Sequence, residues 1–126
     1  MKWVLIVVSI TILGGLAFFA VSIRQDSKAL PAQENAHIIL TERGYEPREV
    51  TIVRGGTVTF STELEKPHWP ASNLHPTHEI YSEFDPKRPL ESNEEWSFSF
   101  TKVGAHNFHD HIRAYFTGTI YVVEGQ

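Results

Sequence analysis

The residues that could do chemistry are concentrated in residues 104–111, which end in His109-Asp110-His111. Side chains on a β-strand point alternately to its two faces. If this stretch is a strand, His109 and His111 share one face, and Asp110 shares the other face with Phe108. Two imidazoles on one face are part of a metal site, and a metal ion needs further ligands from another segment of the chain.

Further ligands are available upstream, in the segment from Pro67 to His78. Its three prolines exclude a regular helix, because proline lacks the backbone donor and clashes with the preceding turn. We predict one metal site at which these segments meet. Its predicted ligands are His68, His75, His78, His109 and His111.

Several of these residues have a second interpretation. His75 and His78 are also candidates for turn residues beside Pro76, and the remaining predicted ligands could simply hydrogen-bond to backbone at one end of the fold. Asp110 has three interpretations: a direct ligand, an acceptor that orients an imidazole, or a turn residue. His37 and His106 are interpreted as surface or edge residues, and His106 has a further interpretation as a hydrogen-bonded core histidine.

The absence of cysteine narrows the chemistry of such a site. Without thiolates the chain cannot form disulfides, iron–sulfur clusters or a blue-copper centre. The only methionine is Met1, so no thioether ligand is available in the domain. Three or four histidines without sulfur suit tetragonal Cu(II). Copper is therefore the predicted metal, and tetrahedral zinc is the second choice.

The first 35 residues are typical of an anchor followed by a tether. Residues 3–23 form an uncharged run of 21 residues, which as a helix would be roughly 31 Å long and would match a bilayer core. The run is too long for a cleaved signal peptide and lacks a cleavage site of small residues. We expect a transmembrane anchor at 1–23, a linker at 24–35 and a domain at 36–126 on the extracytoplasmic side.

The pattern of the domain predicts an all-β fold. Strands are expected at 37–41, 49–53, 57–61 and 94–101, within 104–111 and at 118–122. A further short strand is expected at 78–82. Turns are expected at 44–47 and 54–56. Alternation places a set of apolar side chains in the core: Val50, Ile52, Phe60, Trp96, Phe98, Phe100 and Ile120. Seven or so short strands in about 90 residues predict a β-sandwich.

These motifs, in this order, resemble the cupredoxin family. Residues 44–47 followed by 50–60 resemble its first hairpin, and residues 104–122 resemble its final, ligand-bearing hairpin. His68, eight residues after Phe60, falls where cupredoxins carry their upstream copper histidine. The resemblance covers roughly residues 37–123 and is closest to small plastocyanin-like domains of the EfeO type. It implies a Greek-key β-sandwich of cupredoxin type, here preceded by one transmembrane α-helix.

The sequence departs from cupredoxins in the ligand loop. Asp110 stands where the resemblance places the blue-copper cysteine, six residues after Gly104, and the histidine and methionine ligands of that loop are absent. His109-Asp110-His111 is similar instead to the His-x-His of multicopper oxidases, which use such histidines in all-nitrogen copper sites. The resemblance therefore implies that His68, His109 and His111 bind copper without blue-copper electron transfer.

We expect an exported, membrane-anchored protein that binds one copper ion for capture, buffering or delivery, and that is not an enzyme. One alternative is an oxidase or reductase with a type 2 copper site, and another is a metal-free cell-surface interaction domain. The expected partners are the metal ion, the membrane and an unidentified membrane or periplasmic protein. Nucleic acid is not expected as a partner, because 14 acidic and 8 basic residues from Glu34 onward give a net charge of about −6.

Overall fold

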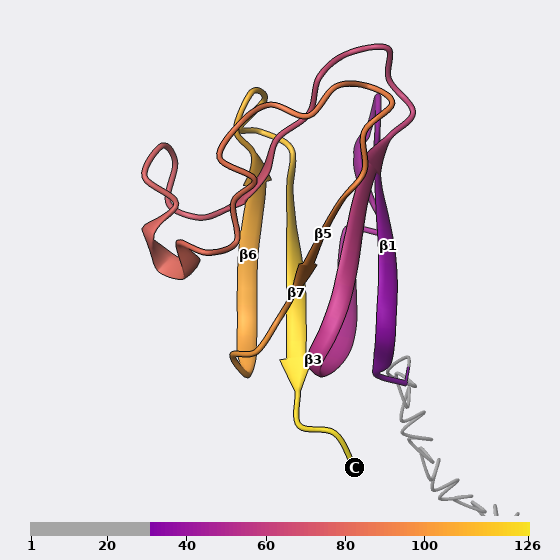
Figure 1. Cartoon of the computed structure of the whole chain (residues 1–126), viewed down its shortest axis with the longest axis vertical. Coiled ribbons are helices and arrows are strands. Elements are labelled where there is room, and N and C mark those ends of the chain that lie inside the picture. Colours follow the sequence, from indigo (N-terminus) through magenta and orange to yellow (C-terminus); the bar gives the residue numbers. More distant parts are fainter. Residues whose placement is uncertain (1–30) are drawn as a thin grey trace, which may run out of the picture.

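The computed structural model describes residues 31–126, which fold as a β-sandwich (Figure 1). Its elements are β1 (Gln33–Thr41), β2 (Gly44–Glu46), β3 (Glu49–Thr62), β4 (Pro70–Ser72), the 3₁₀ helix η1 (Glu79–Tyr81), β5 (Trp96–Ser99), β6 (Gly104–Asp110) and β7 (Thr117–Val123). The predicted anchor at 1–23 lies outside the described residues, as does the linker up to residue 30. Within residues 31–126 no helix is long and apolar enough to cross a membrane.

Strand β3 joins the two halves of the sandwich. Residues 49–53 pair in parallel with β7, whereas residues 57–62 pair with β1 and in part with β5. Between these arms the pairing of β3 with β1 shifts in register, and Gly55 in this stretch has a φ of 84° that suits glycine. The two strands predicted here are the two arms of one continuous element. One half of the sandwich therefore contains β2, β1 and β5, and the other contains β7, β6 and β4.

Aromatic rings fill the space between the two halves. The ring of Phe60 lies with its centroid 5.4 Å from that of Phe108 and 5.6 Å from that of Phe84. Alternation along the strands sends one face of each strand into this core. The predicted core is confirmed: Val50, Ile52, Phe60, Phe100 and Ile120 are buried, and Trp96 and Phe98 pack against them half-buried.

The short strand predicted at residues 78–82 is wrong. This segment forms the 3₁₀ helix η1, and His78 before it has a left-handed φ of 55°, which is incompatible with an extended path. The turn carries Tyr81 into the core, where its hydroxyl lies 3.3 Å from Thr101 Oγ1. The free energy gained by burying the Tyr81 ring favours this turn over the strand that the short apolar pattern predicted.

Strand β6 positions the residues of interest. It lies between β7 and β4, with Pro70 opposite Asp110 and Ala71 opposite His109. The alternation predicted along it is confirmed, since Phe108 joins the hydrophobic core and the neighbouring His109 does not. The short strand β4 therefore brings the histidine-rich segment that follows it alongside the end of β6.

A glycine in β7 allows β6 and β7 to pack this closely. A Cβ atom at Gly118 would lie 2.5 and 2.6 Å from ring carbons of Phe108 and 2.7 Å from the carbonyl oxygen of Arg48. We expect Gly118→Ala to lower the free energy of unfolding by about 1–3 kcal/mol, the usual cost of overpacking. Gly125→Ala is the matched control, because no atom lies within 4 Å of its Cβ position. Equal urea midpoints for the two variants would contradict this packing.

Candidate metal centre

Four imidazoles converge beside the end of β6. His109 is on the strand, His111 follows it directly, and His75 and His78 come from the loop between β4 and η1. One nitrogen of each ring lies within 4.8 Å of the chosen nitrogens of the other three. Two nitrogens bound to one copper or zinc ion at about 2.0–2.1 Å lie no more than about 4.2 Å apart, so a small contraction would let all four bind one ion.

The closest approaches identify the nitrogens that face one another. His75 Nδ1 lies 3.1 Å from His109 Nε2, and His78 Nε2 lies 2.7 Å from His111 Nδ1. These separations match neighbouring ligands of one ion at bond lengths of about 2.0 Å. The candidate donor set is therefore two Nε2 and two Nδ1 atoms, without sulfur or carboxylate.

Backbone hydrogen bonds hold the loop over the strand. The backbone N–H of Asn73 donates to the carbonyl of Asn107 at 3.1 Å, which extends the pairing of β4 with β6. Further along, the N–H of His78 donates to the carbonyl of Leu74 at 2.6 Å and closes the loop upon itself. His75 and His78 are thereby placed on the same side of β6 as His109.

Neighbouring side chains orient two of the rings. Asp85 Oδ2 lies 2.6 Å from His78 Nδ1, and Asn73 Oδ1 lies 2.9 Å from His109 Nδ1. Each oxygen accepts a hydrogen bond from Nδ1–H, so the proton of the ring is on Nδ1 and the lone pair of Nε2 is free to bind a metal. Both rings are therefore presented in the tautomer that a metal ion requires.

Trp69 supports a third ring. Its indole centroid lies 4.4 Å from that of His111, and its Nε1 donates to Asp85 Oδ1 at 2.8 Å. The same carboxylate thus receives hydrogen bonds from the indole and from the ring of His78. Burial raises the pKa of Asp85, but the hydrogen bonds from His78, Trp69 and Lys87 outweigh it and lower that pKa to about 2. The ring of His78 is therefore hydrogen-bonded to an ionised carboxylate.

The imidazoles differ in their contact with solvent. His78 and His109 are buried, with 3% and 2% of their surfaces exposed, whereas His111 is half-buried and His75 is exposed. Burial and the neighbouring imidazoles lower the pKa of His109 to about 4, and the same two causes lower the pKa of His111. Both rings are neutral near pH 7, the state in which nitrogen binds a metal.

His68 does not meet the expectation that it joins this group. It is fully buried, it pairs through its backbone with Leu90, and it is not among the four converging rings. Adjacent residues of an extended chain face opposite sides, so Trp69 faces His111 while His68 faces inward. Within residues 31–126 neither ring nitrogen of His68 has a hydrogen-bond partner, and burial lowers its pKa.

Asp110 acts as a turn and anchor residue. Its buried carboxylate accepts hydrogen bonds from the backbone N–H groups of Trp69 and Arg113, at 2.9 and 2.7 Å, and from the Tyr45 hydroxyl at 3.3 Å. Of its three interpretations, the turn residue matches these contacts. It points away from the imidazole group, as the alternation along β6 requires.

The two remaining histidines lie where they were expected, outside the group. His37 Nε2 lies 2.8 Å from Ser61 Oγ on the surface. His106 Nε2 donates to the carbonyl of Lys102 at 2.6 Å, and its ring packs 5.0 Å from that of Tyr81. The residues that sequence reasoning missed are Asn73 and Asp85. Nothing in their spacing marks them, because both are brought to the rings by the path of a loop.

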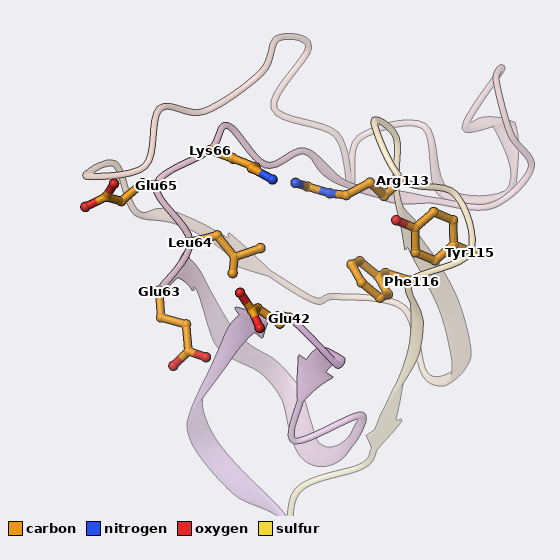
Figure 2. Close-up of a pocket in the computed structure, with 8 residues that line it drawn as sticks. All are labelled: Glu42, Glu63, Leu64, Glu65, Lys66, Arg113, Tyr115 and Phe116. Atoms are coloured by element: carbon orange, nitrogen blue, oxygen red, sulfur yellow. The ribbon is translucent and has the colours of Figure 1, made fainter.

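The four imidazoles do not line the hollow drawn in Figure 2. That hollow has a volume of about 470 Å³ and is lined by Glu42, Glu63, Leu64, Glu65, Lys66, Arg113, Tyr115 and Phe116. The hollow and the histidines are connected through Arg113, which lines the hollow, lies two residues after His111 and is bound by Asp110. The imidazole group is thus a site at the surface of the sandwich and not the floor of this hollow.

Comparison with known proteins identifies the fold. No family model matches the sequence, and no curated protein matches it. A purple cupredoxin from Nitrosopumilus maritimus has a TM-score of 0.60 at 23% identity, over 70% of this chain and 99% of that chain. A reduced amicyanin variant has a TM-score of 0.61 at 20% identity, over 75% of this chain and 88% of that chain. A copper-containing nitrite reductase from Thermus scotoductus SA-01 has a TM-score of 0.56 at 23% identity, over 73% of this chain but 23% of that chain.

These likenesses show that the chain has a cupredoxin-like fold. On that fold it carries a group of four histidines whose nitrogens lie close enough together that they could hold a metal ion. Cupredoxin-like architecture was predicted from the sequence and is confirmed for the described residues.

The lowered pKa of His109 predicts how the stability of the metal-free protein depends on pH. Because its pKa falls from 6.5 to about 4 on folding, the unfolded chain takes up the proton first as the pH falls. Stability should therefore be constant above about pH 6.5 and decrease below it, by on the order of 1–2 kcal/mol between pH 7.5 and pH 5. Urea unfolding across this range measures the effect.

Two variants separate this effect from other titrations. His109→Gln should reduce the pH dependence to the part that comes from the lowered pKa values of His68 and His111. His37→Gln, a change at an exposed histidine, should leave the pH dependence as in the parent. A scan that ends at pH 5 stays above the range in which Asp85 titrates. If His109→Gln retained the full decrease, the burial of a neutral imidazole would not be its cause.

Proposed function

We propose that this protein binds one Cu(II) ion through His75, His78, His109 and His111 and that it captures, buffers or delivers copper. The observation that carries the proposal is the convergence of four imidazole nitrogens within 4.8 Å of one another. Each close pair can share one N–H···N hydrogen bond, and a bound ion would replace these hydrogen bonds by coordination to all four nitrogens.

The donor set favours copper. Four nitrogen donors suit tetragonal Cu(II), and for a given nitrogen site copper binds more tightly than zinc. The ionised Asp85 behind His78 adds negative charge, which favours a doubly charged ion. Copper would supply a redox-active centre when bound, but all four ligands lack the sulfur that gives a blue site its electron-transfer properties.

The exposure of two of the four histidines supports binding and release of the ion. His75 is exposed and His111 half-buried, so an ion can reach the nitrogens from solvent.

The similar folds include a copper-containing nitrite reductase and a Cu(I) amicyanin, which are copper proteins by name. The closer likeness to EfeO-type domains stays a prediction from sequence.

Metal titration of the full chain, purified without a histidine tag, tests the proposal. We expect one Cu(II) per chain, a type 2 paramagnetic resonance spectrum and no intense band near 600 nm, because no thiolate is present. Zn(II) added in equal amount should not displace the copper. Failure to bind copper would contradict the proposal, and turnover of oxygen or nitrite with a reductant would favour the enzyme alternative.

Replacement of the ligands locates the ion. The double variant His109→Ala/His111→Ala should lose at least about a hundredfold in copper affinity, since it removes two of four donors. The matched control is His37→Ala/His106→Ala, which removes two histidines outside the group and should bind copper as the parent does. Equal affinities of both double variants would place the copper elsewhere, and a chain that binds no metal would favour an interaction domain.

We further propose that residues 3–23 anchor the protein in a membrane, with the domain on the extracytoplasmic side. The uncharged run of 21 residues supports this. We expect the full chain to remain in the membrane fraction after a carbonate wash and to keep its original N-terminus. A mature protein that starts between residues 23 and 35 and occurs in the soluble fraction would contradict the anchor.

A further inference from the structure

We infer that His75 is an exchangeable ligand, and that an external imidazole, from a partner protein that gives or receives copper, can take its coordination position. This inference rests on the proposed copper site and assigns different roles to its four histidines. Three of the rings are held by contacts outside the group, and His75 is not.

The three fixed rings each have an independent support. Asp85 holds His78 at 2.6 Å, and Asn73 holds His109 at 2.9 Å. His111 is held by its backbone N–H, which donates to the carbonyl of Trp69 at 2.8 Å, and by the indole against its ring. These supports exist without an ion, so the three nitrogens are already in place when copper arrives.

His75 is held only by the group itself. Within residues 31–126 its one side-chain hydrogen-bond contact is the 3.1 Å approach of Nδ1 to His109 Nε2, and its ring packs against those of His109 and His111. It is also the exposed member of the four. Within the described residues its ring thus has no hydrogen bond and no aromatic contact outside the group.

The difference has a consequence for how copper could leave or enter. Without a hydrogen bond from outside the group, the side chain of His75 competes with external donors at an effective concentration of about millimolar order. A donor of the same chemistry can therefore replace His75 while the three fixed imidazoles keep the ion bound. The copper stays four-coordinate in the mixed complex, so no free ion forms when a partner histidine binds it.

Free imidazole serves as the probe for such a donor. Copper affinity is measured by competition with a chelator for three full-chain proteins: the parent, His75→Ala and His109→Ala. We expect His75→Ala to lose about tenfold in affinity and about 10 mM imidazole to restore both the affinity and the parent resonance spectrum. His109→Ala, which removes a buried and supported ligand, should lose more than about a hundredfold, and imidazole should not restore it.

Circular dichroism of each variant shows whether it is folded, and an unfolded His109→Ala would be replaced by His111→Ala, with the same expectation. Equal losses for the two variants, or failure of imidazole to rescue His75→Ala, would overturn the inference while the copper site itself stands. A parent that binds no copper would overturn the site and the inference together. The parent titration therefore distinguishes the two failures.

Discussion

The buried carboxylate of Asp110 is the contact on which the rest of the site depends. It accepts hydrogen bonds from Tyr45 of β2, from the backbone before β4 and from Arg113 in the loop after β6. A fully buried charge is stable only when it is paired and hydrogen-bonded, and these three segments can satisfy it only by meeting at one place. Asp110 thereby fixes the end of β6 that carries the imidazoles.

Because side chains alternate along β6, fixing the position of Asp110 also fixes the positions of His109 and His111 on the opposite side. Phe108 and Asp110 face the interior, and His109 and His111 lie on the other side with the loop that follows β4. Strand β6 and the residue that follows it thus supply both part of the core and half of the donor set. The closely packed Phe108 and Gly118 behind it leave the strand little freedom, which keeps the two histidines at a fixed separation.

Strand periodicity and residue type were enough to predict the sandwich, most of its core and all four converging histidines. Local patterns could not predict which side of the chain His68 faces, because that depends on the contacts of Trp69 with Asp110 and His111. The turn at η1 was missed for a similar reason, since Tyr81 is drawn into a core built by distant strands. Asn73 and Asp85 reach the rings through loop paths, and short polar residues in loops carry no pattern that announces them.

We propose that one copper ion lies among these four nitrogens. Crystals of the protein grown with one equivalent of Cu(II) would allow an anomalous difference map at the copper edge. We predict a single peak at about 2.0 Å from Nε2 of His78 and His109 and from Nδ1 of His111, with His75 as the fourth ligand on the solvent side. A peak beside His68 or His37, or no peak near β6, would contradict it.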